Sequence, residues 1–201
     1  MTFAFAPLKP RHYGKMLIDP PWAYEMWSPA GYEKSPEAHY PTMTIGELSQ
    51  LPILELLAPN ALVWMWSTWP HLKKAMELMV SLGLTYKTGG AWLKQTKDGG
   101  PVMGTGKIFR SSTEPYIIGT VGQPRIHSRS VRNVIITVVD AFPTAIEAIR
   151  REHSRKPPET REALDLLLPD VPGVELFARE PWPGNDVWGN DIAKFGERIN
   201  G

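Results

Sequence analysis

Short apolar runs alternate with segments of helical periodicity through the first half of the chain. Residues 15–18 and 61–66 are short and mostly apolar, as is typical of strands covered on both faces of a sheet. Apolar side chains recur at helical spacing in residues 45–57 and 70–82, and residues 84–94 predict a third strand. A chain that alternates strands and helices in this way is expected to form an α/β sheet with crossover helices.

Local signals set the expected boundaries of these elements. Thr44 and Glu47 have the spacing of a capping box, and Pro59 is expected to end the helix that they begin. Gly83 stands where a glycine would cap the second helix, and a bend is expected at residues 89–90. The side chains expected to face inward from the second helix are Leu72, Met76, Met79 and Val80. Later segments predict strands at 115–120, 134–139 and 173–178 and a helix at 158–168.

The tetrapeptide Asp19-Pro20-Pro21-Trp22 directly follows the first predicted strand. The prolines remove two backbone donors and prevent a helix from starting at once, and the residue before each proline is pushed to extended geometry. The motif therefore holds a carboxylate, a Pro20 carbonyl without a helical partner and the flat ring of Trp22. This set suits a planar ligand with an exocyclic amino group, because each amino hydrogen meets an acceptor while the ring lies on an aromatic side chain.

Composition excludes several classes of protein. With 201 residues, of which 42% are hydrophobic and 21% charged, we expect a single domain over residues 1–201. The net charge of +1 gives no global attraction for nucleic acid, so any such binding needs a local patch. The absence of cysteine excludes disulfides and thiolate metal sites and fits a cytoplasmic location. No apolar run approaches the ~20 residues of a membrane span, and the five scattered histidines predict no metal site.

Long loops at residues 23–43, 95–113 and 121–133 are the expected places for a functional site. The first is rich in aromatic side chains without apolar periodicity, which favours a lid. The second is rich in glycine and basic residues, which favours contact with a nucleic-acid backbone over a solvated linker. Its Gly104-Thr105-Gly106-Lys107 is not a phosphate loop, because Pro101 replaces the first glycine and Ile108 follows the lysine. Two further basic clusters, one in the third loop and one at residues 150–156, flank a predicted strand and favour phosphate contacts.

Several of these features together resemble the MT-A70 family of adenine methyltransferases. They are Asp-Pro-Pro-Trp at 19–22, His-Tyr-Pro-Thr-Met at 39–43, Trp92-x-Lys94 followed by a glycine-rich loop and Glu114, and His-Ser-Arg-Lys-Pro at 153–157. The matching segments follow in the same order over residues 15–191. The resemblance implies a Rossmann-like class I methyltransferase fold, circularly permuted, with a mixed and mostly parallel sheet and helices on both faces.

The resemblance also implies a reaction and its residues. It implies methyl transfer from S-adenosylmethionine to the 6-amino group of adenine in nucleic acid. Because the chain looks like compact prokaryotic or phage-type members, we expect DNA rather than RNA as the nucleic acid, and a homo- or hetero-dimer is compatible with this. No membrane partner is expected. The implied catalytic residues are Asp19, Pro20, Pro21 and Trp22. The implied substrate-binding residues are Tyr40, Lys94, Arg110 and Glu114. The implied cofactor-binding residues are Asp19, Lys156, Phe177, Arg179, Asn190 and Asp191.

The chain departs from the family pattern in two places. Residues 140–149 look like an insertion, and Trp182 precedes Pro183-Gly184 where the family reads Pro-Gly-Trp. The second departure alters the segment expected to contact the methyl donor. Two alternatives remain: a catalytically inactive nucleic-acid-binding subunit on the same fold, although such relatives lose the aspartate that Asp19 retains, or a methyltransferase for a different amine.

Overall fold

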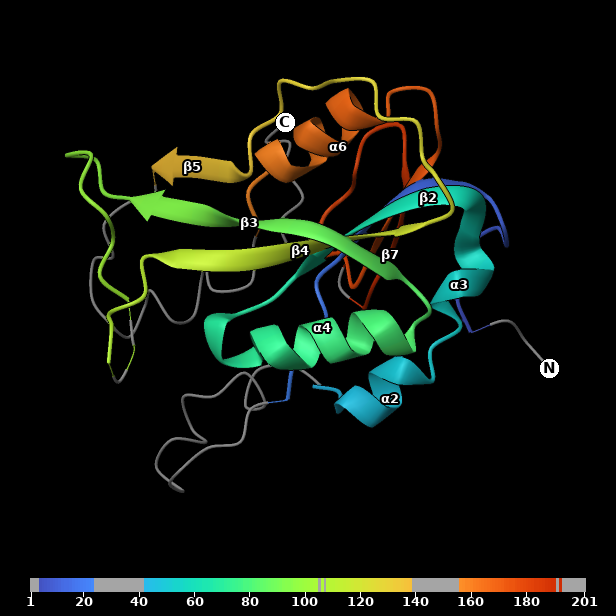
Figure 1. Ribbon diagram of the computed structural model, residues 1–201, viewed down its shortest axis with the longest axis horizontal. Helices are drawn as coiled ribbons and strands as arrows, with labels where there is room; N and C mark the ends of the chain where they lie inside the picture. The colour runs from blue at the N-terminus through green and yellow to red at the C-terminus, as the bar shows by residue number, and fades with distance from the viewer. Residues whose placement is uncertain are drawn as a thin grey trace, which may run out of the picture.

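A computed structural model describes residues 4–23, 42–104, 106, 108–138, 156–190 and 192. Figure 1 shows one twisted sheet with helices on its faces. The strands are β1 (Tyr13–Ile18), β2 (Leu57–Trp66), β3 (Thr85–Gln95), β4 (Thr113–Val121), β5 (Val134–Val138), β6 (Gly173–Leu176) and β7 (Asp186–Trp188). The helices are α2 (Ile45–Ser49), α3 (Ile53–Leu56), α4 (Leu72–Ser81) and α6 (Glu159–Leu167), with a 3₁₀ turn, η2 (Trp69–His71), before α4.

The described strands form one sheet in the order β5-β3-β4-β2-β1-β6-β7. Within it β4 runs antiparallel to β2 and β3, and the other neighbours are parallel. The carboxyl ends of the parallel strands therefore meet the amino end of β4 at one edge, which we call the carboxyl edge. The predicted mixed, mostly parallel α/β sheet of a Rossmann-like methyltransferase is confirmed. In sheets of this kind, ligands bind outside the carboxyl ends of the strands.

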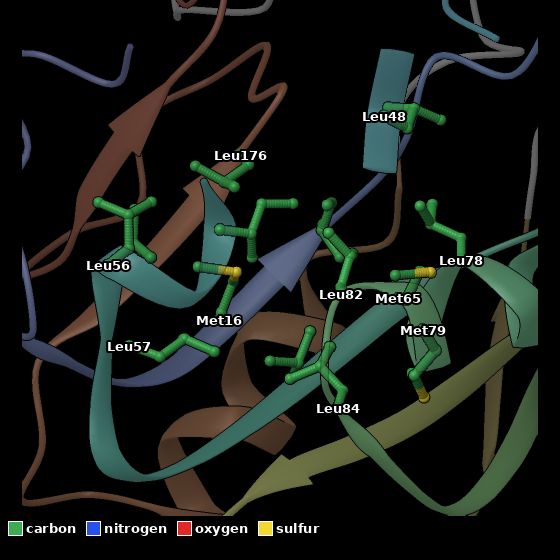
Figure 2. Packing of buried hydrophobic residues seen from close by; sticks show 14 of the residues in the cluster. Met16, Leu48, Leu56, Leu57, Met65, Leu78, Met79, Leu82, Leu84 and Leu176 are labelled. Carbon is green, nitrogen blue, oxygen red and sulfur yellow. The ribbon is translucent and has the colours of Figure 1, made fainter. Parts of the chain in front are cut away.

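Two hydrophobic layers cover the faces of the sheet, because successive side chains of a strand point to opposite faces. Met16 and Ile18 of β1 pack in the layer that includes buried residues of α2, α3 and α4, part of which is shown in Figure 2. Leu17 packs in the opposite layer with Trp64 and Trp66 of β2 and buried residues of α6. All six residues of β1 are buried, so the strand that leads to Asp19 is fixed from both sides.

The predicted helix at residues 45–57 was wrong in its extent. The chain forms the short helices α2 and α3 with Pro52 between them, and β2 begins at Leu57, before Pro59. Proline has no backbone N–H and therefore interrupts the ladder of hydrogen bonds of a continuous helix. The capping box is confirmed: the Glu47 amide donates to the Thr44 hydroxyl at 3.2 Å, and the Thr44 amide donates to the Glu47 carboxylate at 2.7 Å.

The inward face predicted for the second helix was partly wrong. Ala75, Leu78 and Met79 are its buried residues, whereas Met76 and Val80 are 38% and 68% exposed. Apolar side chains surround much of this helix, so periodicity alone did not fix which stripe faces the sheet. The C-cap prediction at Gly83 is consistent with its φ of +73°.

The later strands differ from prediction in smaller ways. The register of β3 against β4 shifts between Tyr86 and Thr88, next to the residues 89–90 at which a bend was predicted. A Cβ on Gly90 would lie 2.0 Å from the carbonyl oxygen of Asn133, so this glycine permits close approach of two backbones. The three-residue strand β7 was not predicted. Among the described residues, no helix has the length and apolar character to cross a membrane.

Candidate active site at the carboxyl edge

The Asp19-Pro20-Pro21-Trp22 motif leaves β1 at the carboxyl edge and is held by the segment before α2. Trp22 and Met43 form a parallel bridge. The Met43 amide donates to the Pro21 carbonyl at 2.8 Å, and the Ala23 amide donates to the Met43 carbonyl at 3.2 Å. These bonds use backbone groups that the prolines keep out of any helix, so the motif has a fixed extended path.

The structure corrects two details of the motif. The Pro20 carbonyl already accepts the Trp22 amide at 2.8 Å, which leaves one of its two lone pairs for a ligand. Trp22 is only 5% exposed, and its ring stacks on His71 with centroids 5.7 Å apart and planes at 12°. The ring therefore faces the interior and fixes the motif, and it does not present an open plate.

His71 is a residue that the sequence analysis missed. It is buried at the end of η2, with Nε2 3.2 Å from the Ala23 carbonyl oxygen and Nδ1 2.9 Å from the Thr68 hydroxyl. Because a carbonyl only accepts, Nε2 is the donor in the first contact. A Trp-Pro-His sequence directly after a strand that ends at the carboxyl edge was the signal that pointed to it.

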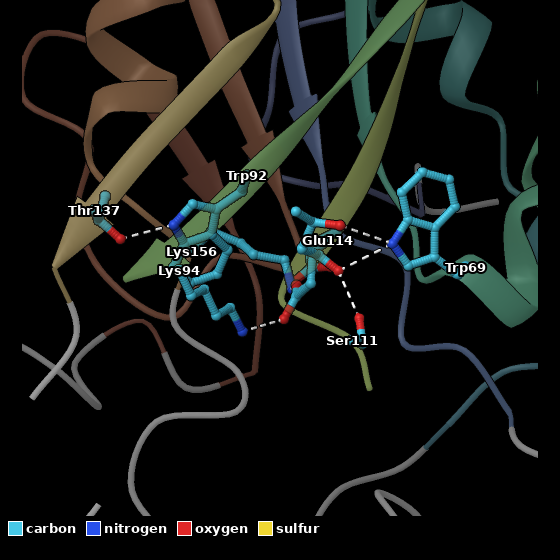
Figure 3. A network of polar contacts seen from close by, with 9 residues as sticks. Trp69, Trp92, Lys94, Ser111, Glu114, Thr137 and Lys156 are labelled. Carbon is cyan, nitrogen blue, oxygen red and sulfur yellow. Dashed lines mark hydrogen bonds and ion pairs between the residues drawn. The ribbon is translucent and has the colours of Figure 1, made fainter. Parts of the chain in front are cut away.

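Four charged side chains form a chain of ion pairs beside the motif: Asp19, Lys156, Glu114 and Lys94. Lys156 Nζ lies 3.2 Å from Asp19 Oδ2 and 3.2 Å from Glu114 Oε2, and Lys94 pairs with Glu114 Oε1. Figure 3 shows Lys94, Glu114 and Lys156 together at this edge. The Asp19 side chain is 25% exposed and the Glu114 side chain 18%, so the cluster is largely buried but open on one side. The structure thus brings together residues that the sequence placed in four separate segments.

The two carboxylates have opposite electrostatic settings. Burial raises the pKa of Asp19, Lys156 opposes this and Glu114 adds to it. Burial acts to raise the pKa of Glu114 as well, but Lys156 and Lys94 together lower it to about 2. Burial acts to lower the pKa of Lys156, and the two carboxylates raise it well above its ordinary value. A pair of acids whose pKa values are pushed apart is a frequent feature of active sites.

Aromatic rings support this cluster. Lys156 Nζ lies 5.6 Å from the ring centroid of Trp66, and Lys94 Nζ lies 4.2 Å from that of Trp92, distances at which a cation is attracted to an aromatic face. Trp92 Nε1 in turn donates to the Thr137 hydroxyl at 2.7 Å. Both lysines are therefore held by packing as well as by charge.

Trp69 is a second residue that the sequence analysis missed. Its side chain is 52% exposed, and Figure 3 shows its ring on the far side of Glu114 from Lys94. Its Nε1 donates to the carbonyl and hydroxyl oxygens of Thr113 at 3.1 and 3.0 Å. These bonds fix an exposed indole ring beside the residue that precedes Glu114 in the chain.

Three of the predicted donor-binding residues, Phe177, Arg179 and Asn190, follow β6 and β7 at the same edge. Phe177 directly follows β6 with a φ of +62°, and Arg179 is close enough to act electrostatically on Asp19. Asn190 is exposed two residues after β7. A carboxylate, a guanidinium and an amide at adjacent strand ends fit the amino-acid and ribose groups of S-adenosylmethionine, which are charged or hydroxylated.

Other predicted features lie elsewhere. Arg110 is exposed in the β3–β4 hairpin and is not among the four charged residues of the cluster. Tyr40, Asp191 and the segment 140–149 lie outside the described residues. A hollow of about 480 Å³ opens against β2, β3 and β4 near α6; residues of the loop 121–133, Arg132 among them, line it, whereas none of the predicted catalytic, substrate-binding or cofactor-binding residues does. Within the described ranges, no group of three or more histidine or carboxylate side chains is arranged to hold a metal ion.

Comparison with known proteins adds independent information. The MT-A70 family model matches residues 13–191. The chain is 28% identical to the Type II methyltransferase M.MunI from Mycoplasma sp, over 94% of this chain and 81% of that protein. It is 28% identical to the N(6)-adenine-specific methyltransferase METTL4 from Homo sapiens, over 90% of this chain and 37% of that protein. It is 29% identical to the N6-methyladenosine RNA methyltransferase MTA1 from Pyricularia oryzae, over 94% and 49%.

The chain therefore spans less than half the length of the last two relatives, and most of the length of the first. The family match covers the strand that precedes Asp19, the charged cluster and the predicted donor-binding residues after β6 and β7. The protein belongs to the MT-A70 family.

Proposed function

We propose that this protein transfers a methyl group from S-adenosylmethionine to the 6-amino group of adenine in nucleic acid, and that DNA is its preferred substrate. The observation that carries the proposal is the position of Asp19. It follows a fully buried central strand and lies at the carboxyl edge with a quarter of its side chain exposed. The relatives named for adenine methylation support the substrate class.

Asp19 and Pro20 supply the two acceptors for the adenine amine. Lys156 contacts Asp19 Oδ2, and we assign one amino hydrogen to Oδ1 and the other to the remaining lone pair of the Pro20 carbonyl. An aromatic amine is a poor nucleophile, because its lone pair is delocalised into the ring. Two hydrogen bonds that favour a pyramidal nitrogen localise that pair, and the bond to the charged carboxylate is the stronger one.

The charge that develops during transfer also favours this arrangement. The nitrogen lone pair forms the new N–C bond while the S–C bond breaks, so positive charge appears on nitrogen beside the Asp19 carboxylate. The methylated ammonium then releases a proton to water, for which Asp19 need not be a strong base. Much of the remaining acceleration comes from in-line placement.

We propose that the methyl donor and the adenine bind at different parts of the carboxyl edge, the donor beyond β6 and β7 and the adenine near β3 and β4. When bound, S-adenosylmethionine supplies an electrophilic methyl group on a sulfonium sulfur. Phe177, Arg179 and Asn190 lie beyond β6 and β7 and are proposed to hold this donor, together with Asp191. Lys94, Glu114 and the exposed ring of Trp69 are proposed to line the adenine side, where Tyr40 is proposed to join them. Lys156 connects the two sides through Asp19 and Glu114.

The preference for DNA rests on the coverage of the relatives. The chain covers 81% of the Type II methyltransferase but 49% of the relative named for RNA. Adenine in a duplex must leave the base stack to reach the acceptors.

The test uses purified protein, labelled S-adenosylmethionine and DNA or RNA of several sequences, followed by digestion and detection of N6-methyladenine. We expect methylation of DNA by the wild type and by Asp170→Asn, a matched control at an exposed position. We expect Asp19→Asn to lose the activity while it still binds nucleic acid. Methylation by Asp19→Asn at the wild-type rate would refute the mechanism, and transfer only to another amine would refute the substrate.

One observation favours the non-catalytic alternative. The Asp19 carboxylate is already engaged by Lys156, as in a structural ion pair. If the protein is a binding subunit, the wild type will bind nucleic acid and give no N6-methyladenine with any substrate. The same experiment therefore separates the two functions.

A further inference from the structure

The connection between β3 and β4 is a hairpin whose base lies in the charged cluster. Lys94 is the second-to-last residue of β3 and Glu114 is the second residue of β4. Their side chains pair, and the Lys94 amide donates to the Ser112 carbonyl at 3.0 Å. Figure 1 shows this green to yellow-green connection extending beyond the ends of the strands. The hairpin therefore projects from the candidate active site, and any large substrate at Asp19 passes near it.

Two glycines lie close to the opposite arm of the hairpin near its tip. The Gly104 amide donates to the Ser111 carbonyl at 2.9 Å. A Cβ on Gly104 would lie 2.4 Å from that carbonyl oxygen, and a Cβ on Gly106 would lie 1.9 Å from the carbonyl oxygen of Phe109. Only glycine fits at such distances. The two arms thus close on each other through contacts that a side chain would prevent.

This closed tip presents apolar side chains to water. Ile108, Phe109 and Met103 are 87%, 84% and 79% exposed, and they are the most exposed large apolar side chains in the described part of the chain. Single exposed apolar residues are ordinary, but three within seven positions form a patch that suits a binding surface. Arg110, exposed beside them, adds a cation.

The distance along the chain places this patch within reach of a bound duplex. Phe109 is five residues before Glu114, so at most about 17 Å separates their Cα atoms in an extended chain. This is the rise of about five base pairs. The patch is thus within the length of a short duplex segment from the charged cluster that holds Asp19 and Glu114.

We propose that Phe109 and Ile108 form a wedge that enters the base stack of duplex DNA next to the target adenine. This inference rests on the proposed function and adds how the duplex is opened. Apolar side chains inserted between base steps unstack them and kink the duplex. The wedge fills the space that the extruded adenine leaves, so it lowers the free energy of flipping, while Arg110 contacts a phosphate.

The test compares Phe109→Ala with the wild type on two substrates of one sequence, a paired duplex and the single strand. Base–aromatic contacts of this kind are worth a factor of about ten or more in binding or rate. We expect Phe109→Ala to lose at least about tenfold in single-turnover methylation of the duplex and to keep the wild-type rate on the single strand. Leu166→Ala, which removes an exposed apolar side chain on α6, should match the wild type on both.

Two further measurements separate the wedge from other roles. In a duplex with 2-aminopurine at the target position, the fluorescence of this base rises when it leaves the stack. We expect a larger rise with wild-type protein than with Phe109→Ala. Arg110→Ala should lower the affinity for the duplex and for the single strand by the same factor, and it should reduce the salt dependence of binding.

If Phe109→Ala lost the same factor in methylation rate on the duplex and on the single strand, or lost none, the wedge would be refuted and the proposed function would stand. A wild type that methylates only single strands, or a Phe109→Ala variant that changes only self-association, would have the same meaning. A wild type that methylates no adenine would instead overturn the proposed function, and the 2-aminopurine signal would still report the wedge.

Discussion

Replacing Glu114 by glutamine gives a direct measure of the charged cluster. Glu114 lies between two lysines, which lower its pKa from 4.5 to about 2 in the folded protein even though burial opposes this. Each pKa unit corresponds to about 1.4 kcal/mol, so the ionised carboxylate contributes about 3 kcal/mol to the free energy of unfolding. Because the folded-state pKa is the lower one, this contribution is complete above about pH 4.5 and is lost as the pH falls through about 2.

The assay is urea unfolding of wild type and Glu114→Gln between pH 2 and pH 7. We expect Glu114→Gln to be less stable by about 3 kcal/mol at pH 7. The difference should shrink to less than about 0.5 kcal/mol near pH 2, where Glu114 is half protonated in the folded protein and a neutral glutamic acid resembles glutamine. The control is Glu77→Gln, which removes an exposed helical pair with Lys73 at 3.8 Å and should change stability by about 0.5 kcal/mol or less. A difference between Glu114→Gln and wild type that does not change with pH would refute this account of the cluster.

Three further substitutions test the supports of the site. His71→Ala removes the ring stacked on Trp22 and should lower both the free energy of unfolding, by about 1–3 kcal/mol, and the methylation rate; an unchanged rate would show that the stack does not position the motif. Arg161→Met removes the cation that the buried Glu175 carboxylate contacts at 2.8 Å and should lower the free energy of unfolding in urea by about 3–5 kcal/mol. A decrease below about 1 kcal/mol would contradict this. Gly90→Ala places a Cβ against the backbone before β5 and should speed hydrogen exchange of the β5 amides, whereas wild-type exchange would mean that the strands have room for it.

The architecture was predictable where the sequence pattern had a single physical meaning. Each run predicted as a strand overlaps a strand of the sheet, because short length and flanking turn residues favour a strand over a buried helix for such runs. Helix details were less predictable. Pro52 divided one expected helix, and the buried stripe of α4 was misassigned because the sheet, and not the periodicity, decides which stripe is covered. β7 was missed because three residues carry too little pattern.

The candidate site was predictable in its members but not in its contacts. Asp19, Lys94, Glu114 and Lys156 were each named from the sequence, and the sheet brings them together. The ion pairs among them depend on side-chain directions that no spacing rule supplies. The burial of Trp22 under His71 has the same origin, since a stacked pair of residues 49 positions apart leaves no local signal.

The order of the strands has a consequence for how the protein acquires its activity during synthesis. β1 lies between β2 and β6, and the Tyr13 hydroxyl donates to Asp186 at 2.6 Å across 173 positions of sequence. During synthesis, Asp19 is made before β6 and before Lys156. Its carboxylate therefore has no ion pair with Lys156 until most of the polypeptide has left the ribosome. Contacts this distant in sequence form slowly, and the reactive centre is therefore assembled among the last events of folding.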